Sequence, residues 1–431
     1  MAPRHQAPRG TRDLLPGETA RWQWAEARAR EVLERYGYRE IRTPMFEEYE
    51  LFARTSGESS DVVQKEMYRF KDLGDRDLAL RPENTAGVVR AYLEHGLGGH
   101  ARIHRLWYLG PMFRYGRPQK GRYRQFSQFG AEVLGTPAAG ADVEIIALFV
   151  DIFRAWGFAD LTVLVNSVGT PESRRAYGEA LNRWLAPVRD QLSADSQRRL
   201  EHNPLRVLDT KDPKDHAVMQ ALGTPMPRMI DSLDPESQAH WVQVLAGLDA
   251  LGIAYEIDHG LVRGLDYYTR TAFEVHDRSL GAQSALGGGG RYDGLVEALG
   301  GSPTPGVGFS IGLDRAILVM EEQQRGPGMA AVQIYVAAMD STRDEALRLS
   351  RRLRERWSVD LDLESRTLSA QMKAADKSGA AWLVLLGDDE WQRRQVVLKD
   401  LRGGSQQAVP LDQLDDTLSA RLGATAGDIT A

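Results

Sequence analysis

Residues 105–131 read RLWYLGPMFRYGRPQKGRYRQFSQFGA, and this stretch is the most informative part of the chain. It opens with an apolar run typical of a β-strand, then continues into a segment where basic and aromatic residues alternate without any acidic residue. The basic residues of that segment are Arg114, Arg117, Lys120, Arg122 and Arg124. A surface hairpin remains the alternative, but such a hairpin usually mixes both signs of charge because like charges repel. Arginine pairs with phosphate oxygens through two hydrogen bonds and aromatic rings stack on bases, so the segment favours a nucleotide or RNA ligand.

The composition limits the class of protein. The chain has 431 residues, which suggests two or three domains that each bury a core. It contains no cysteine, which excludes disulfides, thiolate zinc sites and cysteine nucleophiles. The formal net charge is -6, so the chain as a whole is not a basic nucleic-acid binder, although a local basic surface can still contact phosphates. The longest apolar stretches are too short to cross a bilayer and the N-terminus lacks a secretory signal, so we expect a cytosolic protein.

The first part of the chain, up to about residue 170, predicts a mixed α/β domain with an antiparallel sheet. Charged helical stretches alternate there with strand-like runs at residues 40–43, 78–80 and 105–109. Between residues 171 and 252 the apolar residues recur at helical spacing among charged ones. These apolar residues are Tyr177, Leu181, Trp184, Leu185, Val188 and Leu192. The spacing predicts an inserted helical module.

Strand signals return at residues 254–257 and 270–276, and an apolar helix starts near Gly312, so this part is expected to rejoin the first sheet. Residues 323–329 contain two glycines and a proline and are the best linker candidate. Beyond residue 330, strand-like runs alternate with helical ones. That alternation predicts a separate small α/β domain with a mostly parallel sheet.

Residues 81–85 read RPENT and follow the strand-like run 78–80 directly. Pro82 fixes the turn, so Glu83 and Thr85 are expected to project from a strand end, where a carboxylate and a hydroxyl could hold an ammonium group. The alternative is a plain helix start with Asn84 or Thr85 as its cap, and the local sequence supports both readings equally.

Two further segments combine polar residues or glycines in ways that suggest a ligand. Residues 262–271 read VRGLDYYTRT and crowd charged and aromatic residues into one turn, which serves a ligand more often than a core; a surface hairpin is the alternative. Residues 287–293 read GGGGRYD, where consecutive glycines would let a backbone approach a ligand closely. A flexible linker is the alternative for this second segment. The regular apolar pattern on both of its sides counts against a linker.

Several familiar motifs are missing from the sequence. It has no Gly-x-x-x-x-Gly-Lys-Ser/Thr phosphate loop, no Gly-x-Gly-x-x-Gly turn after a strand, no Gly-x-Ser-x-Gly elbow and no His-Glu-x-x-His. If ATP binds, arginines must therefore hold its phosphates.

Taken in order, these motifs resemble the successive signatures of bacterial histidyl-tRNA synthetases, which are class II aminoacyl-tRNA synthetases. The matching stretches are residues 10–16, 57–58, 65–68, 81–85, 111–130, 263–271, 288–293, 308–315, 375–377 and 399–401. The set covers nearly the whole chain, and the RGLDYY turn is peculiar to the histidine branch. The resemblance implies a histidine–tRNA ligase, which activates histidine with ATP to histidyl-adenylate and pyrophosphate and then transfers histidine to the 3′ end of tRNA(His).

The resemblance also implies the domain organisation. Residues 1–170 and 253–325 would form the class II catalytic domain around an antiparallel sheet, residues 171–252 a helical insertion domain, and residues 330–431 an α/β anticodon-binding domain. The family forms homodimers through its first class II motif, here residues 39–48. ATP would bind with Mg²⁺ as a substrate, with no prosthetic group and no metal site assigned to protein side chains.

Site residues follow from the same resemblance. Arg114 would contact the α-phosphate of ATP, Arg315 the γ-phosphate and Arg263 the reacting phosphate, which makes Arg114 and Arg263 the candidate catalytic residues. The histidine-binding residues would be Glu83, Thr85, Gln128, Glu132, Arg263, Tyr267 and Tyr268. Of these, Glu83, Thr85 and Gln128 would hold the backbone of the amino acid, and Glu132 with Tyr268 would read the imidazole. The tRNA acceptor end would meet Arg117, Gln119, Lys120 and Arg122.

Three positions depart from the family pattern. The second class II motif usually reads Phe-Arg-x-Glu, and its glutamate is expected to accept a hydrogen bond from the adenine amino group, but this chain has Gly116 there. The family usually also has glycine where this chain has Asn84 and histidine where it has Ser127. The adenine contact and details of the histidine pocket are therefore expected to differ.

Two other functions are compatible with part of the sequence. A paralogue that resembles the catalytic domain serves as the regulatory subunit of ATP phosphoribosyltransferase, and it would bind histidine without charging tRNA. The arginine-rich segment and the domain after residue 330, which such regulators lack, argue against it, whereas Gly116 argues for it. A generic RNA-binding protein would not need the turn at residues 263–271.

Overall fold

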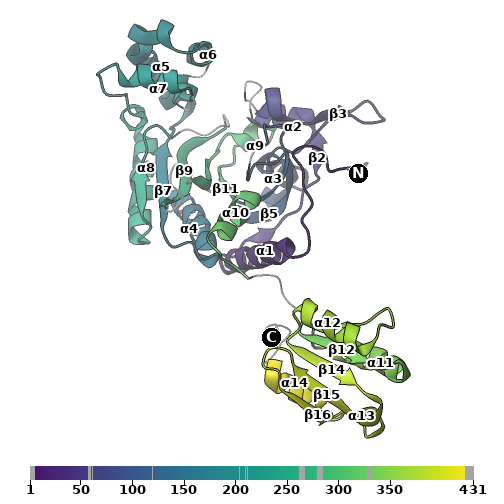
Figure 1. Ribbon diagram of the computed structural model, residues 1–431. Coiled ribbons are helices and arrows are strands. Elements are labelled where there is room, and N and C mark those ends of the chain that lie inside the picture. Colours follow the sequence, from purple (N-terminus) through teal and green to yellow (C-terminus); the bar gives the residue numbers. More distant parts are fainter. Residues whose placement is uncertain are drawn as a thin grey trace. The chain divides into compact units, whose positions relative to one another are not determined.

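The computed structural model describes residues 5–56, 60, 62–118, 120–202, 204–208, 210, 212–261, 267–278, 285–327 and 332–422. The chain divides into two compact units, Met1–Pro327 and Gly328–Ala431 (Figure 1). The division falls inside the stretch that the sequence marks as a linker.

An eight-stranded sheet, ordered β1-β5-β6-β11-β10-β9-β7-β8, forms the centre of the first unit. Its strands are β1 Arg39–Glu40, β5 His104–Phe113, β6 Gln125–Leu134, β7 Leu161–Ser167, β8 Tyr255–Ile257, β9 Thr269–Asp277, β10 Ala285–Arg291 and β11 Gly306–Gly312. The six strands from β5 to β7 pair antiparallel, and only the outermost strands β1 and β8 pair parallel to their neighbours. The antiparallel sheet expected from the sequence is confirmed, and the glycine run of residues 287–290 is part of strand β10 rather than a loop.

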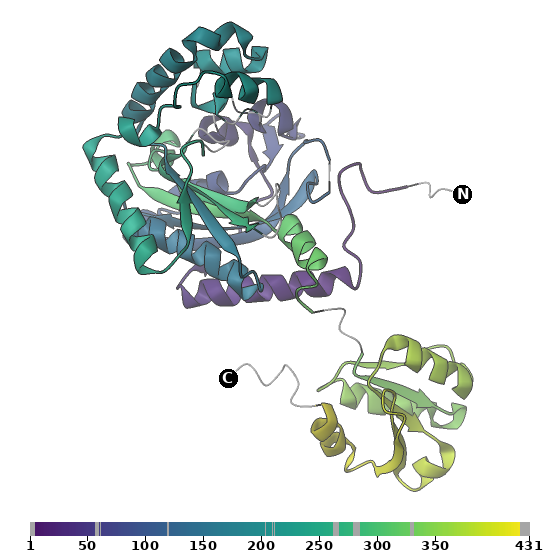
Figure 2. The ribbon, with the colours of Figure 1, turned by 60° about the vertical axis from the view of Figure 1, so that its left-hand side comes forward.

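Alternation along β5 and β6 separates the two faces of this sheet. Trp107 and Phe129 stack on each other in the core of the first unit. Helices α1 (Glu18–Arg35), α4 (Ala139–Ala155) and α8 (Pro235–Ala250) contribute to the same core and lie along this face of the sheet (Figure 2). Helix α4 is mostly apolar and is buried along most of its length, as expected for a helix that packs against a core. Leu106 and Tyr108 point to the opposite face, because successive side chains on a strand alternate.

The opposite face is covered by helix α3 (Thr85–Glu94) and the short helix α9 (Leu295–Ala298), which share an apolar cluster with Leu106 and Tyr108. A separate three-stranded sheet, ordered β2-β4-β3, consists of β2 Phe46–Glu48, β3 Arg69–Lys71 and β4 Asp77–Leu80. Helix α2 (Tyr49–Ser56), the π-helical turn Val62–Glu66 and the 3₁₀ turn Leu97–Gly99 complete this side. The run 78–80 therefore lies in this small sheet and not in the large one.

The described residues between 171 and 250 contain helices and no strands. The helices are α5 Pro171–Leu185, α6 Ala194–His202, α7 Pro213–Gln220 and α8, with 3₁₀ turns at Ala186–Gln191, Pro204–Val207 and Met229–Ser232. Helices α5, α6 and α7 form a cluster apart from the large sheet (Figure 1). Tyr177, Leu181 and Leu185 are buried in this cluster, which explains their helical spacing in the sequence.

After β11, helix α10 (Leu313–Glu322) begins at Gly312, as expected from the sequence. The second unit contains a five-stranded sheet ordered β13-β12-β14-β15-β16. Its elements are β12 Ile334–Ala338, a 3₁₀ turn Asp340–Thr342, α11 Arg343–Leu353, β13 Val359–Leu361, α12 Leu368–Ser378, β14 Trp382–Leu386, α13 Asp388–Gln392, β15 Gln395–Asp400, β16 Gln406–Pro410 and α14 Leu414–Leu422. The prediction of a mostly parallel sheet was wrong, because β14-β15 and β15-β16 pair antiparallel. The short connections after β14 and β15 leave no room for the crossover that a parallel pair needs.

None of the described helices combines the length and the apolar character that crossing a membrane requires.

Candidate active site

The turn at residues 81–85 both starts a helix and presents a buried carboxylate, so it combines the two alternatives that the sequence left open. Helix α3 begins at Thr85, and the buried carboxylate of Glu83 accepts hydrogen bonds from the backbone N of Thr85 (2.6 Å) and of Ala86 (3.0 Å). Glu83 therefore satisfies two free N–H groups at the start of the helix, where a negative charge is favoured. Burial raises the pKa of Glu83, and these hydrogen bonds oppose the rise.

Glu132 lies on β6, directly across from Leu106, and faces the same side of the sheet as α3. It is 1% exposed, and three hydroxyl groups surround its carboxylate. Thr85 Oγ1 donates to Oε1 at 2.8 Å, Tyr292 donates to Oε2 at 2.6 Å, and the Tyr108 hydroxyl lies 3.4 Å from Oε1. Burial raises the pKa of Glu132 to about 8, while the hydrogen bond from Tyr292 and then that from Thr85 lower it and the nearby charge of Glu83 raises it.

Tyr267, Tyr268 and Tyr292 form an aromatic wall beside this carboxylate. The ring centroids of Tyr267 and Tyr268 are 4.7 Å apart, and those of Tyr267 and Tyr292 are 5.8 Å apart. The glycines next to the wall make room for it, since a Cβ on Gly308 would lie 1.7 Å from Glu132 Oε2, and one on Gly290 2.8 Å from the Tyr268 ring. The glycine run thus admits neighbouring side chains at close range.

Gln128 also belongs to β6, and its side chain is 5% exposed. Its Oε1 is buried without a hydrogen-bond partner in the part of the chain that the structure describes. Leaving a buried carbonyl oxygen unpaired is costly, so this atom suits a donor that a ligand brings. Ser127, the residue before it, donates its backbone N to Asp314 Oδ2 at 2.7 Å, which ties β6 to the start of α10.

The two arginines expected at the phosphates lie on the segment after β5 and on α10. Arg114 donates through Nε to the Pro82 carbonyl at 2.8 Å, and its guanidinium lies over the Phe126 ring at 5.6 Å. Its positive charge also lowers the pKa of Glu83. Burial, followed by the nearby positive charge of Arg122, lowers the pKa of Arg315. The structure therefore brings Arg114 next to Glu83, as the sequence predicts.

Arg117, Lys120 and Arg122 are exposed, and Lys120 pairs with Glu322 of α10 at 2.6 Å. Their exposure leaves them accessible to a large polyanion. Two of the predicted site residues, Arg263 and Gln119, lie outside the described residues.

Sequence reasoning gave no role to Tyr108 or Tyr292, both of which reach Glu132. The sequence could have suggested Tyr292, because this residue belongs to the GGGGRYD segment that stands out in the sequence. Tyr108 sits in an ordinary apolar strand pattern, and nothing local distinguishes it from a core residue. Arg291, from the same segment as Tyr292, is fully buried and donates a hydrogen bond to Asp142 rather than to Glu132.

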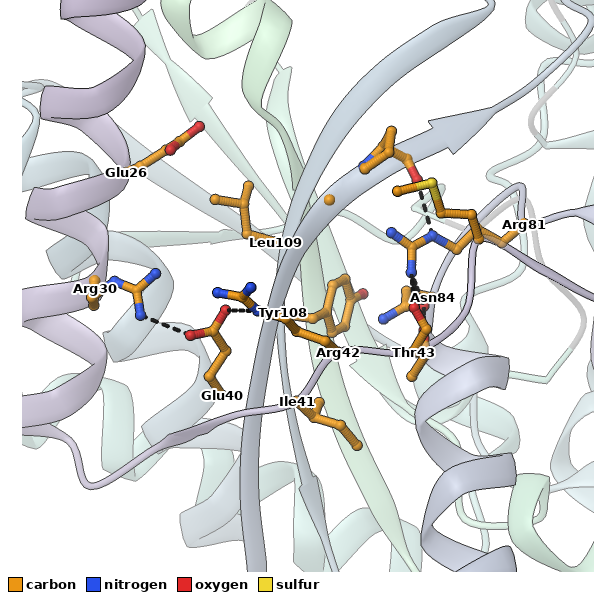
Figure 3. Close-up of a pocket in the computed structure, with 13 residues that line it drawn as sticks. Glu26, Arg30, Glu40, Ile41, Arg42, Thr43, Arg81, Asn84, Tyr108 and Leu109 are labelled. Atoms are coloured by element: carbon orange, nitrogen blue, oxygen red, sulfur yellow. Dashed lines mark hydrogen bonds and ion pairs between the residues drawn. The ribbon is translucent and has the colours of Figure 1, made fainter.

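A separate pocket of about 370 Å³ lies beside the turn at residues 81–85 (Figure 3). Its lining includes Arg30, Glu40, Arg81 and Asn84 and none of the predicted site residues. Asn84 Oδ1 accepts a hydrogen bond from the Thr43 hydroxyl at 2.5 Å and one from Arg81 at 3.3 Å. The Asn84 side chain therefore contacts Thr43, which lies within residues 39–48.

The raised pKa of Glu132 predicts a pH-dependent stability. Between its ordinary value of 4.5 and about 8, the unfolded chain loses the proton that the folded chain keeps, so stability falls as pH rises. Glu132→Gln cannot ionise, so its unfolding free energy should gain on that of the unmodified protein by up to about 1.4 kcal/mol per pH unit across this window. Urea titrations of both forms between pH 5 and 9 measure the difference. Parallel curves would show that Glu132 keeps an ordinary pKa.

Comparisons with known proteins agree with this arrangement. The family model "Histidyl-tRNA synthetase" matches residues 10–316, and the model "Anticodon binding domain" matches residues 332–421. The histidine–tRNA ligase of Thermosynechococcus vestitus is 49% identical over 411 residues, which cover 95% of this chain and 95% of that protein. The histidine–tRNA ligase of Synechococcus sp. (strain JA-3-3Ab) is 50% identical over 406 residues, covering 94% of this chain and 96% of that protein. The crystal structure of apo histidyl-tRNA synthetase from S. aureus is similar with a TM-score of 0.80 and 38% identity, covering 96% of this chain and 99% of that one. The chain belongs to the histidyl-tRNA synthetase family.

Proposed function

We propose that this protein is a histidine–tRNA ligase, which forms histidyl-adenylate and pyrophosphate from histidine and ATP and then transfers histidine to the 3′ end of tRNA(His). The observation that carries this function is the pair of buried carboxylates, Glu83 and Glu132, with the guanidinium of Arg114 close enough to Glu83 to lower its pKa. Histidine brings two nitrogen-bearing groups to such a pair, an ammonium and an imidazole. Its carboxylate and the phosphates of ATP need the arginine.

In this proposal Glu132 and Tyr268 read the imidazole, and Tyr267 packs beside them. Glu83 and Gln128 hold the ammonium, for which the unpaired Oε1 of Gln128 supplies an acceptor. Thr85 acts through its hydroxyl, which already holds Glu132 in position. An amino acid whose side chain has no ring N–H could not add a hydrogen bond to the buried Glu132 carboxylate, which disfavours its binding relative to histidine.

Adenylation needs positioning and charge neutralisation more than a general base, because the histidine carboxylate is already an anionic nucleophile. We assign Arg114 to the α-phosphate, Arg315 to the γ-phosphate and Arg263 to the reacting phosphate. Among the described residues no three acidic or histidine side chains converge as a metal site. We expect Mg²⁺ to arrive with ATP, bound to its phosphate oxygens, where it neutralises charge.

The tRNA would meet the catalytic unit through Arg117, Gln119, Lys120 and Arg122, and the second unit through an anticodon-binding surface. We assign residues 1–170 and 253–325 to catalysis, residues 171–252 to a helical insertion and residues 330–431 to anticodon binding, and we expect the enzyme to work in the cytosol beside its tRNA. The match of residues 332–421 to an anticodon-binding model supports the ligase over a regulatory subunit of ATP phosphoribosyltransferase, which lacks such a domain.

We also propose a homodimer formed through residues 39–48. Met45 and Phe46 in this segment are 51% and 53% exposed, and the Phe46 ring packs edge-on against the half-exposed Phe70. Large apolar side chains gathered on a surface favour association. Sedimentation of the unmodified protein and of Phe46→Asp tests the proposal. The unmodified protein should sediment as a dimer and the variant as a monomer.

Histidine-dependent exchange of pyrophosphate into ATP tests the proposed function. A ligase exchanges label only when histidine is present, whereas a regulatory subunit should show none. Absence of exchange, with the protein folded and ATP and Mg²⁺ in excess, would reject the ligase.

The division of the chain into two units predicts the behaviour of a fragment that ends at Gly326. The fragment keeps the whole large sheet and its core, so we expect histidine-dependent pyrophosphate exchange at a rate similar to that of the full chain. Aminoacylation of tRNA should fall strongly, because anticodon contacts are lost. Circular dichroism confirms that the fragment folds. Full aminoacylation by a folded fragment would contradict the role assigned to the second unit.

A further inference from the structure

Glu66 ends the π-helical turn Val62–Glu66 and lies against the arginine-rich segment that follows β5. Its backbone carbonyl accepts a hydrogen bond from the Tyr115 N at 2.6 Å, which fixes the turn to that segment. Its carboxylate is partly buried and has neither a hydrogen-bond nor an ion-pair partner among the described residues. Short π-helical turns occur often at functional sites, so an unpaired carboxylate in one suggests a ligand.

The carboxylate of Glu66 lies on the side of the segment that Arg114 faces. The ladder between β5 and β6 continues past β5, because Arg114 N donates to the Arg124 carbonyl at 2.9 Å. Alternation then directs the side chains at positions 114 and 116 to one side and Tyr115 to the other, where its ring meets Tyr68. A Cβ on Gly116 would lie 3.7 Å from Glu66 Oε1. The glycine therefore leaves open the space into which Glu66 points.

The chemistry of the substrates restricts what this carboxylate can bind. A hydrogen-bond donor suits it, whereas the phosphates of ATP are anions that would repel it. Within ATP the donors are the 6-amino group of adenine and the two ribose hydroxyls. The donors of histidine are already assigned to Glu83, Gln128 and Glu132. Of the remaining groups the 6-amino group is farthest from the phosphates, where a second negative charge is least unfavourable.

We infer that Glu66 accepts a hydrogen bond from the 6-amino group of adenine and selects ATP in place of the carboxylate that position 116 lacks. This inference rests on the proposed function, because it takes ATP as the substrate bound at Arg114. It gives a role to Glu66 of residues 65–68, a stretch that matches the family but had no assigned role. Arg114 would neutralise the phosphate. Glu66, which lies beside Gly116, would bind the base.

The test compares ATP with purine riboside triphosphate, which lacks the 6-amino group, in the histidine-dependent exchange reaction. For the unmodified protein the KM of the analogue should exceed that of ATP by about tenfold to a hundredfold, the loss expected for one hydrogen bond to a charged acceptor. Glu66→Ala should raise the KM of ATP by a similar factor and leave the KM of the analogue and the KM of histidine unchanged. Glu66→Gln keeps the shape of the side chain, so its KM for ATP should lie between that of the unmodified protein and that of Glu66→Ala. Glu34→Ala, which removes an exposed carboxylate of α1, is the matched control and should change neither nucleotide.

Gly116→Glu in the Glu66→Ala background supplies a second route to the same contact, since it puts a carboxylate beside the vacated position. It should recover most of the lost preference for ATP. An equal increase in the KM of ATP and of the analogue in Glu66→Ala would overturn the inference. So would an increase in KM that is seen with ATP but not with 2′-deoxyATP, because that result would assign Glu66 to the ribose.

Titration of each nucleotide into the protein without histidine repeats the comparison independently of the reaction. A preference for ATP that Glu66→Ala does not reduce in this titration rejects the role of Glu66. Intact, Glu66-dependent binding of ATP by a protein that exchanges no pyrophosphate would reject the ligase function alone.

Discussion

Arg114→Ala should lower the rate of histidine-dependent pyrophosphate exchange by about a hundredfold to a thousandfold. Charge develops at the α-phosphate as the histidine carboxylate attacks, and removing one fixed donor aimed at such charge typically has an effect of this size. Arg114 is preset for this task, because the Pro82 carbonyl holds its Nε at 2.8 Å and the Phe126 ring lies beneath its guanidinium. The loss should appear in kcat as well as in the KM of ATP. Pyrophosphate exchange at saturating histidine separates the two.

Arg117→Ala is the matched control, because it removes an exposed arginine from the same segment. Exchange should stay within about twofold of the unmodified rate in this variant, while aminoacylation of tRNA declines. Equal losses of exchange in both variants would show that the segment attracts ATP by its overall charge, and the specific role of Arg114 would be wrong.

The largest effect on stability is expected at Arg291. This arginine and Asp142 are both 0% exposed, and the guanidinium donates to Asp142 Oδ1 at 3.1 Å and to Asp293 Oδ1 at 3.0 Å. It also holds the Thr136 carbonyl at 3.0 Å, so it ties β10 to the start of α4. Arg291→Met would leave Asp142 buried without this partner, which typically costs about 3–5 kcal/mol. Urea titration should show that the free energy of unfolding falls by that amount.

Two further variants separate the buried charge from other causes. Adding Asp142→Leu to Arg291→Met removes the stranded charge and should recover a large part of the loss, since apolar replacement of a whole buried pair is often tolerated. Arg54→Met breaks the exposed pair with Glu50 on α2 and should cost at most about 0.5 kcal/mol. A double variant no more stable than Arg291→Met would show that the hydrogen bonds to backbone carbonyls, not the charge, stabilise this site.

Arg291 also illustrates where sequence reasoning reached its limit. The GGGGRYD segment was interpreted as a ligand-binding loop, yet Arg291 is a buried structural residue and its neighbour Tyr292 bonds Glu132. Arg291 is the last residue of β10 and Tyr292 follows it, yet the two side chains bond different partners, Asp142 and Glu132. The segment itself shows no such difference, because the partner Asp142 is 149 residues away along the chain.

The sequence by itself determined the features that depend on local patterns. Helical spacing predicted the helices of residues 171–252, strand runs predicted the central strands, and the order of motifs predicted the family. The family resemblance also predicted that Arg114 and Glu83 serve one site, and the roles of both residues stay a prediction. In the second unit the local patterns missed β15 and β16, since each is a short strand in which only one or two side chains are fully buried.

Only the tertiary structure decided which groups surround the buried carboxylate. Glu132 receives its hydrogen bonds from Thr85, 47 residues away, and from Tyr292, 160 residues away. Those contacts depend on the strand order and on the register of β6 against β5 and β11, in which a shift of one residue would turn Glu132 to the opposite face. Register follows from the packing of the whole sheet, so no local stretch of sequence contains it.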